Sequence, residues 1–224
     1  MAHIFLIVEG ATEEQFYKKT LQGYFINPDG SYRHYIEAVQ MPSKKNIYSR
    51  ENKGGRVSYQ ACVNNVRRFL NQASHADLFM LIFDYYGLDV TFKDHLTPMQ
   101  ASMNDQVDAI QKRLETEINN PRFRFRLQVH EFEAFLFSKP EIIAEHFSKP
   151  SSLEAIRQVL SQFGNDPEMI NDDPKTVPSK RLDRLFDKFG KTSDGLIIAQ
   201  KIGVAGIREK CRRFDQMCRE IDRL

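Results

Sequence analysis

Long apolar runs are missing from this sequence of 224 residues, and their absence excludes a membrane-spanning protein. No run approaches the roughly 20 apolar residues that a helix needs to cross a bilayer. The apolar run near the N-terminus, Ile4 to Val8, is short and is followed at once by Glu9, unlike a signal peptide. We therefore expect a cytoplasmic protein with no membrane partner.

Cysteine is also scarce. Cys62, Cys211 and Cys218 are odd in number and form no Cys-x-x-Cys pair. This pattern argues against a disulfide framework and against a zinc ribbon. Cys211 and Cys218 are seven residues apart, and we interpret them as small core residues on one helix face.

The sequence also has no large excess of positive or negative charge, and its net charge is +2. From Lys139 onward 16 Lys and Arg stand against 14 Asp and Glu, and before it 16 stand against 16. Composition alone therefore does not indicate nucleic-acid binding, which must rest on local features. A hydrophobic content of 41% and a charged content of 28% indicate a globular chain with ample material for a core.

The most informative stretch that is present runs from His3 to Gln15. Ile4 to Val8 predicts a strand buried on both faces, and Glu9 stands where that strand ends. Thr12 and Gln15 have the spacing of a capping box, which predicts a helix that begins at Thr12. Ligands of open α/β sheets bind beyond the carboxyl ends of the strands, so Glu9 is a candidate site residue.

Two further predicted strands also end on acids. Asp77 to Phe83 predicts a second buried strand followed by Asp84, and Phe123 to His130 alternates apolar and polar residues before Glu131 and Glu133. An unpaired buried carboxylate costs several kcal/mol, so such acids normally lie at a polar edge or on a metal. If a helix has begun at Glu131, the two glutamates diverge by about 200° and only one faces the site.

The order of these elements predicts the fold class. Strands alternate with helices up to residue 138, with a further strand at Tyr32 to Val39, which predicts an α/β domain with a mostly parallel four-stranded sheet and helices on both faces. After Lys139 the pattern is helical, so residues 139–224 are predicted to form a helical extension packed on the domain of residues 1–138. The last predicted helix, Gly206 to Leu224, is long enough to serve a homodimer, and the oligomeric state stays open.

Acids that converge at one sheet edge repel one another, and a shared proton or a bound divalent cation relieves the repulsion. Oxygen ligands without cysteine or paired-histidine motifs suit Mg²⁺ or Mn²⁺. A Mg²⁺ ion held by one or two carboxylates, with positions left for water and phosphate oxygens, is typical of phosphodiester chemistry. The residues alone therefore favour metal-dependent phosphodiester chemistry.

The same residues carry a resemblance to a known family. Val8 to Glu14 resembles the first motif of Toprim domains, and Asp84 matches the first acid of their second motif. Four segments in order resemble, more narrowly, one bacterial Toprim-like family of unknown function: Asp84 to Leu88, His130 to Phe137, Pro178 to Arg181, and Ile202 to Arg208 with Cys211 and Phe214. The resemblance covers nearly the whole chain and implies a Toprim-like Rossmannoid core with a helical extension.

The resemblance also implies site residues. Glu9 and Asp84 carry over as catalytic and metal-binding residues of a nuclease that depends on Mg²⁺ or Mn²⁺, and Glu13 as a further metal ligand. Most Toprim sites have Asp-x-Asp after the third strand, whereas Tyr86 occupies the second acidic position here. The candidates for the missing oxygen are Asp89, Glu131 and Glu133, of which we favour Glu131 as a catalytic and metal-binding residue.

Supporting roles are assigned to four more residues, each with an alternative. His130 is a candidate for proton transfer, or else a histidine of the core or sheet face. Lys53, in the glycine-bearing stretch 41–57, is a candidate for steadying transition-state charge, or else part of a solvated connector. Lys180 and Arg181 are candidates for contact with a nucleic-acid backbone, or else serve helix packing.

The family resemblance further implies partners. Members are often encoded beside AAA- or ABC-type ATPases, and related Toprim proteins of phage-defence systems are nucleases partnered by ATPases. This implies DNA or RNA as substrate, an ATPase partner and a role in phage defence. One alternative is a non-catalytic Toprim-like module bound to an ATPase, which Tyr86 and the balanced charge favour. Nucleotidyl transfer, as in primases or topoisomerases, is disfavoured because no zinc-ribbon cysteines accompany the core.

Overall fold

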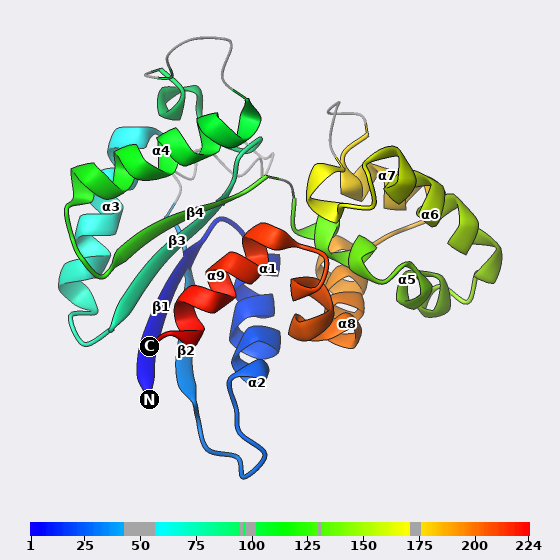
Figure 1. Ribbon diagram of the computed structural model, residues 1–224, viewed down its shortest axis with the longest axis horizontal. Coiled ribbons are helices and arrows are strands. Elements are labelled where there is room, and N and C mark those ends of the chain that lie inside the picture. Colours follow the sequence, from blue (N-terminus) through cyan, green and yellow to red (C-terminus); the bar gives the residue numbers. More distant parts are fainter. Residues whose placement is uncertain (43–56, 95, 97–101, 130, 171–175) are drawn as a thin grey trace, which may run out of the picture.

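A computed structural model describes residues 1–42, 57–94, 96, 102–129, 131–170 and 176–224. Its centre is a sheet of four parallel strands in the order β2-β1-β3-β4 (Figure 1). The strands are β1 (Ala2–Val8), β2 (His34–Gln40), β3 (Leu78–Asp84) and β4 (Phe123–Gln128). The predicted fold class is confirmed: an α/β core, a parallel four-stranded sheet with helices on both faces, and a helical C-terminal extension.

The two central strands, β1 and β3, are buried on both faces, as their unbroken apolar runs predict. Successive side chains of a strand point to opposite faces, so Ile4 and Leu6 enter one core cluster while Phe5 and Ile7 enter the other. Full burial of each such side chain stabilises the fold by roughly 1.5–3 kcal/mol. The apolar run of β1 therefore fixes the centre of the sheet.

Helices cover each face of the sheet (Figure 1). One face packs against a continuous helical segment formed by α1 (Ala11–Phe16), the π-helical turn η1 (Tyr17–Leu21) and α2 (Gln22–Tyr24), and against α9 (Arg212–Asp222). The other face packs against α3 (Tyr59–Gln72) and α4 (Met103–Ile118), whose first turns are capped by Ser58 and Ser102. A short 3₁₀ turn, η2 (Val90–Phe92), precedes α4.

The chain after β4 is helical, as predicted. Its elements before α9 are η3 (Phe132–Ser138), α5 (Pro140–His146), η4 (Pro150–Ser152), α6 (Leu153–Gln162), η5 (Pro167–Met169), α7 (Pro178–Leu185), η6 (Lys191–Gly195) and α8 (Leu196–Arg208). Ile198 of α8 and Phe214 of α9 belong to the same core cluster as Leu6 of β1. The extension thus shares a core with the sheet, and a domain boundary near residue 138 stays a prediction.

The predicted start of the first helix is wrong. The helix begins at Ala11 with Gly10 as its N-cap, and no side chain caps it, so Thr12 does not have that role. The carboxylate of Glu13 turns back over Gly10, where an added Cβ would lie 2.7 Å from Oε2 of Glu13. A glycine at position 10 leaves room for this acid beside the end of β1.

The predicted last helix, Gly206 to Leu224, is also wrong, because α8 runs to Arg208 and α9 starts at Arg212. Within α8, Gly203 has φ of 73° and ψ of 161°, a conformation that interrupts the helix and that side-chain-bearing residues rarely adopt. Glu168 then stabilises the separate start of α9. Its carboxylate accepts the N–H of Arg213 at 2.9 and 3.0 Å and that of Phe214 at 3.1 Å.

All three cysteines are buried and free, in agreement with the prediction of small core residues. Crossing a bilayer would take a longer and more apolar helix than any in the described part of the chain.

Candidate functional site

The acids predicted from the strand ends lie where the connections of the sheet diverge. β1 continues into α1 on one face, whereas β3 is followed by α4 on the opposite face. These two strands are neighbours, with Val8 opposite Ile82, so Glu9 and Asp84 lie at the same edge of the sheet. Ligands of open α/β sheets bind at such a switch point.

Glu9 approaches the turn that follows Asp84. The N–H of Gly87 donates to the carbonyl of Asp84 at 3.0 Å. A Cβ added to Gly87 would lie 3.3 Å and 3.4 Å from the two carboxylate oxygens of Glu9. Glycine at this position therefore allows the acid of one strand end to pack against the turn of the other.

Asp84 is partly buried, and within the described residues no hydrogen bond or ion pair reaches its carboxylate. Burial raises the pKa of Asp84 well above its usual range, and the nearby charges of Glu13 and Glu9 raise this pKa further. Glu131 and Glu133 act in the same direction. Burial and the neighbouring acids thus disfavour the negative charge of Asp84.

Glu131 and Glu133 face one cation together. Glu131 lies just before η3 in an extended conformation, with φ of −54° and ψ of 154°, so the divergence expected within a helix does not apply to this pair. Nζ of Lys191 lies 3.4 Å from Oε1 of Glu131 and 3.7 Å from Oε1 of Glu133. Both predicted acids therefore line the site.

Burial and the interactions between these charged groups shift their pKa values. Burial raises the pKa of Glu133 to about 7, although Lys191 opposes this shift. Burial also raises the pKa of Glu13. Burial opposes the charge of Lys191, but Glu133 and Glu131 raise its pKa above the usual value, so this ammonium group stays charged among the acids.

Sequence reasoning missed Lys191 because it follows no strand and belongs to no motif. It lies in η6, in the C-terminal extension, and the sequence signal next to it is the preceding glycine, Gly190. A second missed contact comes from α7, where the backbone N–H of Ser179 donates to Oε2 of Glu131 at 3.3 Å. The extension thus contributes a cation and a backbone donor to an acid of the sheet domain.

Other predicted residues have structural contacts. Asp89 caps η2, and its Oδ1 accepts the backbone N–H of Thr91 at 3.0 Å. Lys180 pairs with Asp183 at 3.2 Å. Arg181 donates from Nε to the carbonyl of Thr176 at 2.6 Å and lies over the ring of Phe163. The proposed contact of Lys180 and Arg181 with nucleic acid stays a prediction, and His130 and Lys53 lie outside the described residues.

The strand-end acids do not form a preassembled group of metal ligands in the described chain. Among the described residues, the group of three metal-ligating side chains whose donor atoms all lie within 4.8 Å of one another is His3, Glu37 and His75, at the other edge of the sheet. The carboxylates of Glu9 and Asp84 belong to no such group.

The parallel sheet and the acids at its switch point define an α/β chain with an acidic candidate site. The chain belongs to a family described as "Domain of unknown function (DUF4276)", which matches residues 8–222.

The individual proteins that match this chain share little sequence identity with it. An alanine–tRNA ligase of Picrophilus torridus is 24% identical over 200 residues, a match that takes in 76% of this chain and 23% of the ligase. The chain thus spans about a quarter of that relative's length. Two structures of the C-terminal region of the OLD protein of Xanthomonas campestris pv. campestris cover 98% and 99% of this chain and 97% of their own. Their identities are 13% and 14%, with TM-scores of 0.37 and 0.36.

Proposed function

We propose that this protein is a Mg²⁺- or Mn²⁺-dependent nuclease whose active site is the acidic group at the ends of β1 and β3. The observation that carries the proposal is Asp84, a carboxylate without a hydrogen-bond or ion-pair partner in the described chain, surrounded by the charges of Glu9 and Glu13. Structural acids are normally paired with a cation or with hydrogen-bond donors, and a cluster of acids with perturbed pKa values is typical of a functional site.

The donor set fits a hard divalent cation, because it consists of carboxylate oxygens. Glu9, Glu13, Asp84 and Glu131 are the residues that would hold the ion. When bound, such an ion polarises a phosphodiester and lowers the pKa of a bound water.

The protein's own residues supply the remaining functions. Glu131 and Glu133 hold the ammonium group of Lys191 at the rim of the acidic group, where it can donate to a phosphate oxygen. The N–H of Ser179 orients Glu131 from the start of α7. Gly87 keeps side chains away from Glu9 and allows the backbone of its turn to approach a substrate.

Cleavage assays with end-labelled single- and double-stranded DNA and RNA, in Mg²⁺, Mn²⁺ and EDTA, test the proposal. We expect metal-dependent cleavage that falls by at least about a hundredfold in Glu9→Gln and Asp84→Asn, which keep the side-chain shape while removing charge. Asp183→Asn, at the exposed pair with Lys180, is the matched control and should keep wild-type activity. Metal-dependent cleavage that persists in both site variants would contradict the assignment.

A non-catalytic module bound to an ATPase is the second candidate, and Tyr86 favours it. This residue replaces the second acid of the usual motif, and its 45% exposed side chain directs its hydroxyl to Sδ of Met103 at 3.7 Å. An AAA- or ABC-type ATPase partner and a role in phage defence follow from the family resemblance alone. Binding of such an ATPase by wild type and by Asp84→Asn alike, with no cleavage by either, would favour the module.

A further inference from the structure

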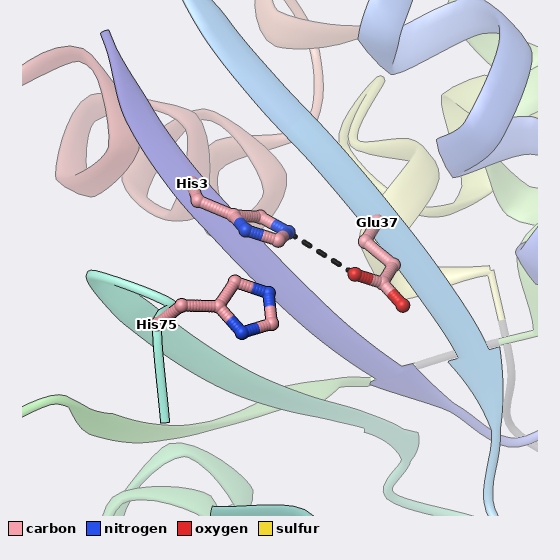
Figure 2. A group of neighbouring side chains, drawn as sticks. All are labelled: His3, Glu37 and His75. Atoms are coloured by element: carbon pink, nitrogen blue, oxygen red, sulfur yellow. Dashed lines mark hydrogen bonds and ion pairs between the residues drawn. The ribbon is translucent and has the colours of Figure 1, made fainter. Parts of the chain in front are cut away.

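A second group of ligating side chains lies toward the amino-terminal ends of the parallel strands, whereas the acids lie at the carboxyl ends. His3 lies near the start of β1, Glu37 lies on the neighbouring β2, and His75 lies in the loop between α3 and β3 (Figure 2). One donor atom from each of the three lies within 4.8 Å of the other two. Nε2 of His3 is 3.1 Å from Oε2 of Glu37, and the rings of His3 and His75 have centroids 4.6 Å apart.

The register of the sheet places the first two ligands. In the β1·β2 pairing His3 is opposite Tyr35 and Phe5 is opposite Glu37, so His3 and Glu37 are diagonal neighbours on one face. Such neighbours are within reach of each other when both side chains are long. This spacing is set by backbone hydrogen bonds of the sheet, so it does not depend on flexible segments.

The loop that carries His75 is fixed from two sides. The N–H of Asp77 donates to the carbonyl of His3, and Oδ2 of Asp77 accepts the N–H of His3, both at 2.8 Å. Arg122 of the loop before β4 donates from one guanidinium nitrogen to the carbonyls of Ser74 and Ala76, both at 2.7 Å. These carbonyls flank His75, so its backbone is held beside β1 before any ligand arrives.

We propose that His3, Glu37 and His75 form a binding site for one zinc ion. Two imidazoles and one carboxylate are a common zinc ligand set, with ligand distances of about 2.0–2.2 Å and tetrahedral geometry. Neighbouring ligands of such an ion are then roughly 3.3 Å apart, close to the 3.1 Å between His3 and Glu37. The exposed side of His75 leaves the fourth position to water.

This site is separate from the proposed active site. His3 and Glu9 are at opposite ends of β1, roughly 20 Å apart at the rise of a strand. The ligand sets also differ, because imidazole nitrogen suits zinc while the carboxylates beyond β1 and β3 suit Mg²⁺. The zinc ion would link β1, β2 and the loop before β3 at the amino-terminal ends of the strands.

Calorimetric titration of the metal-free full-length chain with Zn²⁺ tests the proposal. We expect Zn²⁺ to bind at this site in wild type, and this binding to weaken at least about tenfold in His75→Ala and in Glu37→Gln. His146→Gln is the matched control, since His146 also pairs with a carboxylate, Asp194, at 2.9 Å but belongs to no group of three ligating side chains among the described residues. Asp84→Asn should leave this binding unchanged, which separates it from the proposed active site.

Co²⁺ gives a second readout, because tetrahedral Co²⁺ with nitrogen and oxygen ligands absorbs visible light more strongly than octahedral Co²⁺. We expect this absorption in wild type and in Asp84→Asn, and its loss in His75→Ala. His75 is exposed, so its substitution leaves the fold intact. Zinc binding by His75→Ala and Glu37→Gln within about twofold of wild type, or no zinc binding by wild type, would overturn the proposal.

Discussion

At the scale of one residue, the electrostatic surroundings of Asp84 identify the candidate site. Its charge is disfavoured by burial and by the neighbouring Glu13 and Glu9, so the folded state binds a proton more tightly at Asp84 than the unfolded state does. The stability that this carboxyl contributes is therefore fully present below its unfolded pKa and is lost as pH rises through its raised folded pKa. Without a metal, Asp84 destabilises the fold at neutral and alkaline pH.

Asp84→Asn is accordingly expected to stabilise the metal-free protein. In EDTA at pH 8, we expect its free energy of unfolding in urea to exceed that of wild type by about 1–3 kcal/mol, because a charge without a partner has been removed. The gain should shrink as pH falls and vanish below the unfolded pKa, where wild-type Asp84 is protonated in both states. The exposed control Asp183→Asn should change stability by less than about 0.5 kcal/mol. A loss of stability in Asp84→Asn both at pH 8 and at a pH below the unfolded pKa of Asp84 would contradict this role.

Lys191 is the residue that holds Glu131 and Glu133 in place. Lys191→Met removes an ammonium group that lowers the pKa of Glu133, so this pKa should rise above its wild-type value of about 7. Carboxyl-carbon NMR titration of the metal-free protein measures the shift. Lys180→Met, which removes a more exposed lysine paired with Asp183, should leave the Glu133 titration unchanged. An unaltered pKa of Glu133 in Lys191→Met would exclude a direct interaction.

At the scale of elements, α9 depends on a cap from another part of the chain. Cys211 occupies its N-cap position, but its side chain does not cap the helix, and Glu168 of η5 accepts the backbone N–H groups of Arg213 and Phe214 instead. Glu168→Ala should therefore reduce the free energy of unfolding by about 1–2 kcal/mol, as for other lost caps. Glu168→Gln keeps an acceptor oxygen and should lose less in the same urea titration. Equal losses in the two variants would mean that the hydrogen bonds do not carry the effect.

The break in α8 gives a second prediction at this scale. Gly203 has a positive φ and open space around it, so Gly203→Ala should cost about 1–3 kcal/mol through backbone strain alone. Gly23 also has open space around it but lies in α2 without a positive φ, so Gly23→Ala should be neutral or stabilising by up to about 1 kcal/mol. Thermal unfolding of the two variants makes the comparison. If Gly203→Ala is as stable as Gly23→Ala, the backbone at position 203 can adopt a regular helical conformation at no cost.

At the scale of the whole molecule, the features that the sequence predicts are those set by local pattern. The apolar runs of β1 and β3 predict buried central strands because only a doubly covered strand can be apolar on both faces. Glu9 and Asp84 could be placed at one edge because parallel strands end at the same side of a sheet. Helix ends were less predictable, since the cap of α9 comes from Glu168, more than a full helix away in the chain.

The contacts that the sequence could not reveal depend on tertiary packing. Lys191 reaches Glu131 and Glu133 only because the extension folds back onto the sheet domain. His3, Glu37 and His75 meet through strand register and a fixed loop, and no spacing motif joins them. The two candidate metal sites lie at opposite edges of one sheet, so each can be altered while the other serves as its control.

The most direct measurement of the central claim is calorimetric titration of the full-length protein with Mn²⁺ and Mg²⁺. Binding should occur in wild type and weaken at least about tenfold in Asp84→Asn and in Glu9→Gln, because each variant removes a carboxylate ligand. Glu37→Gln, which alters the opposite edge of the sheet, should bind like wild type. Equal affinities in wild type, Asp84→Asn and Glu9→Gln would contradict a divalent-cation site at the ends of β1 and β3.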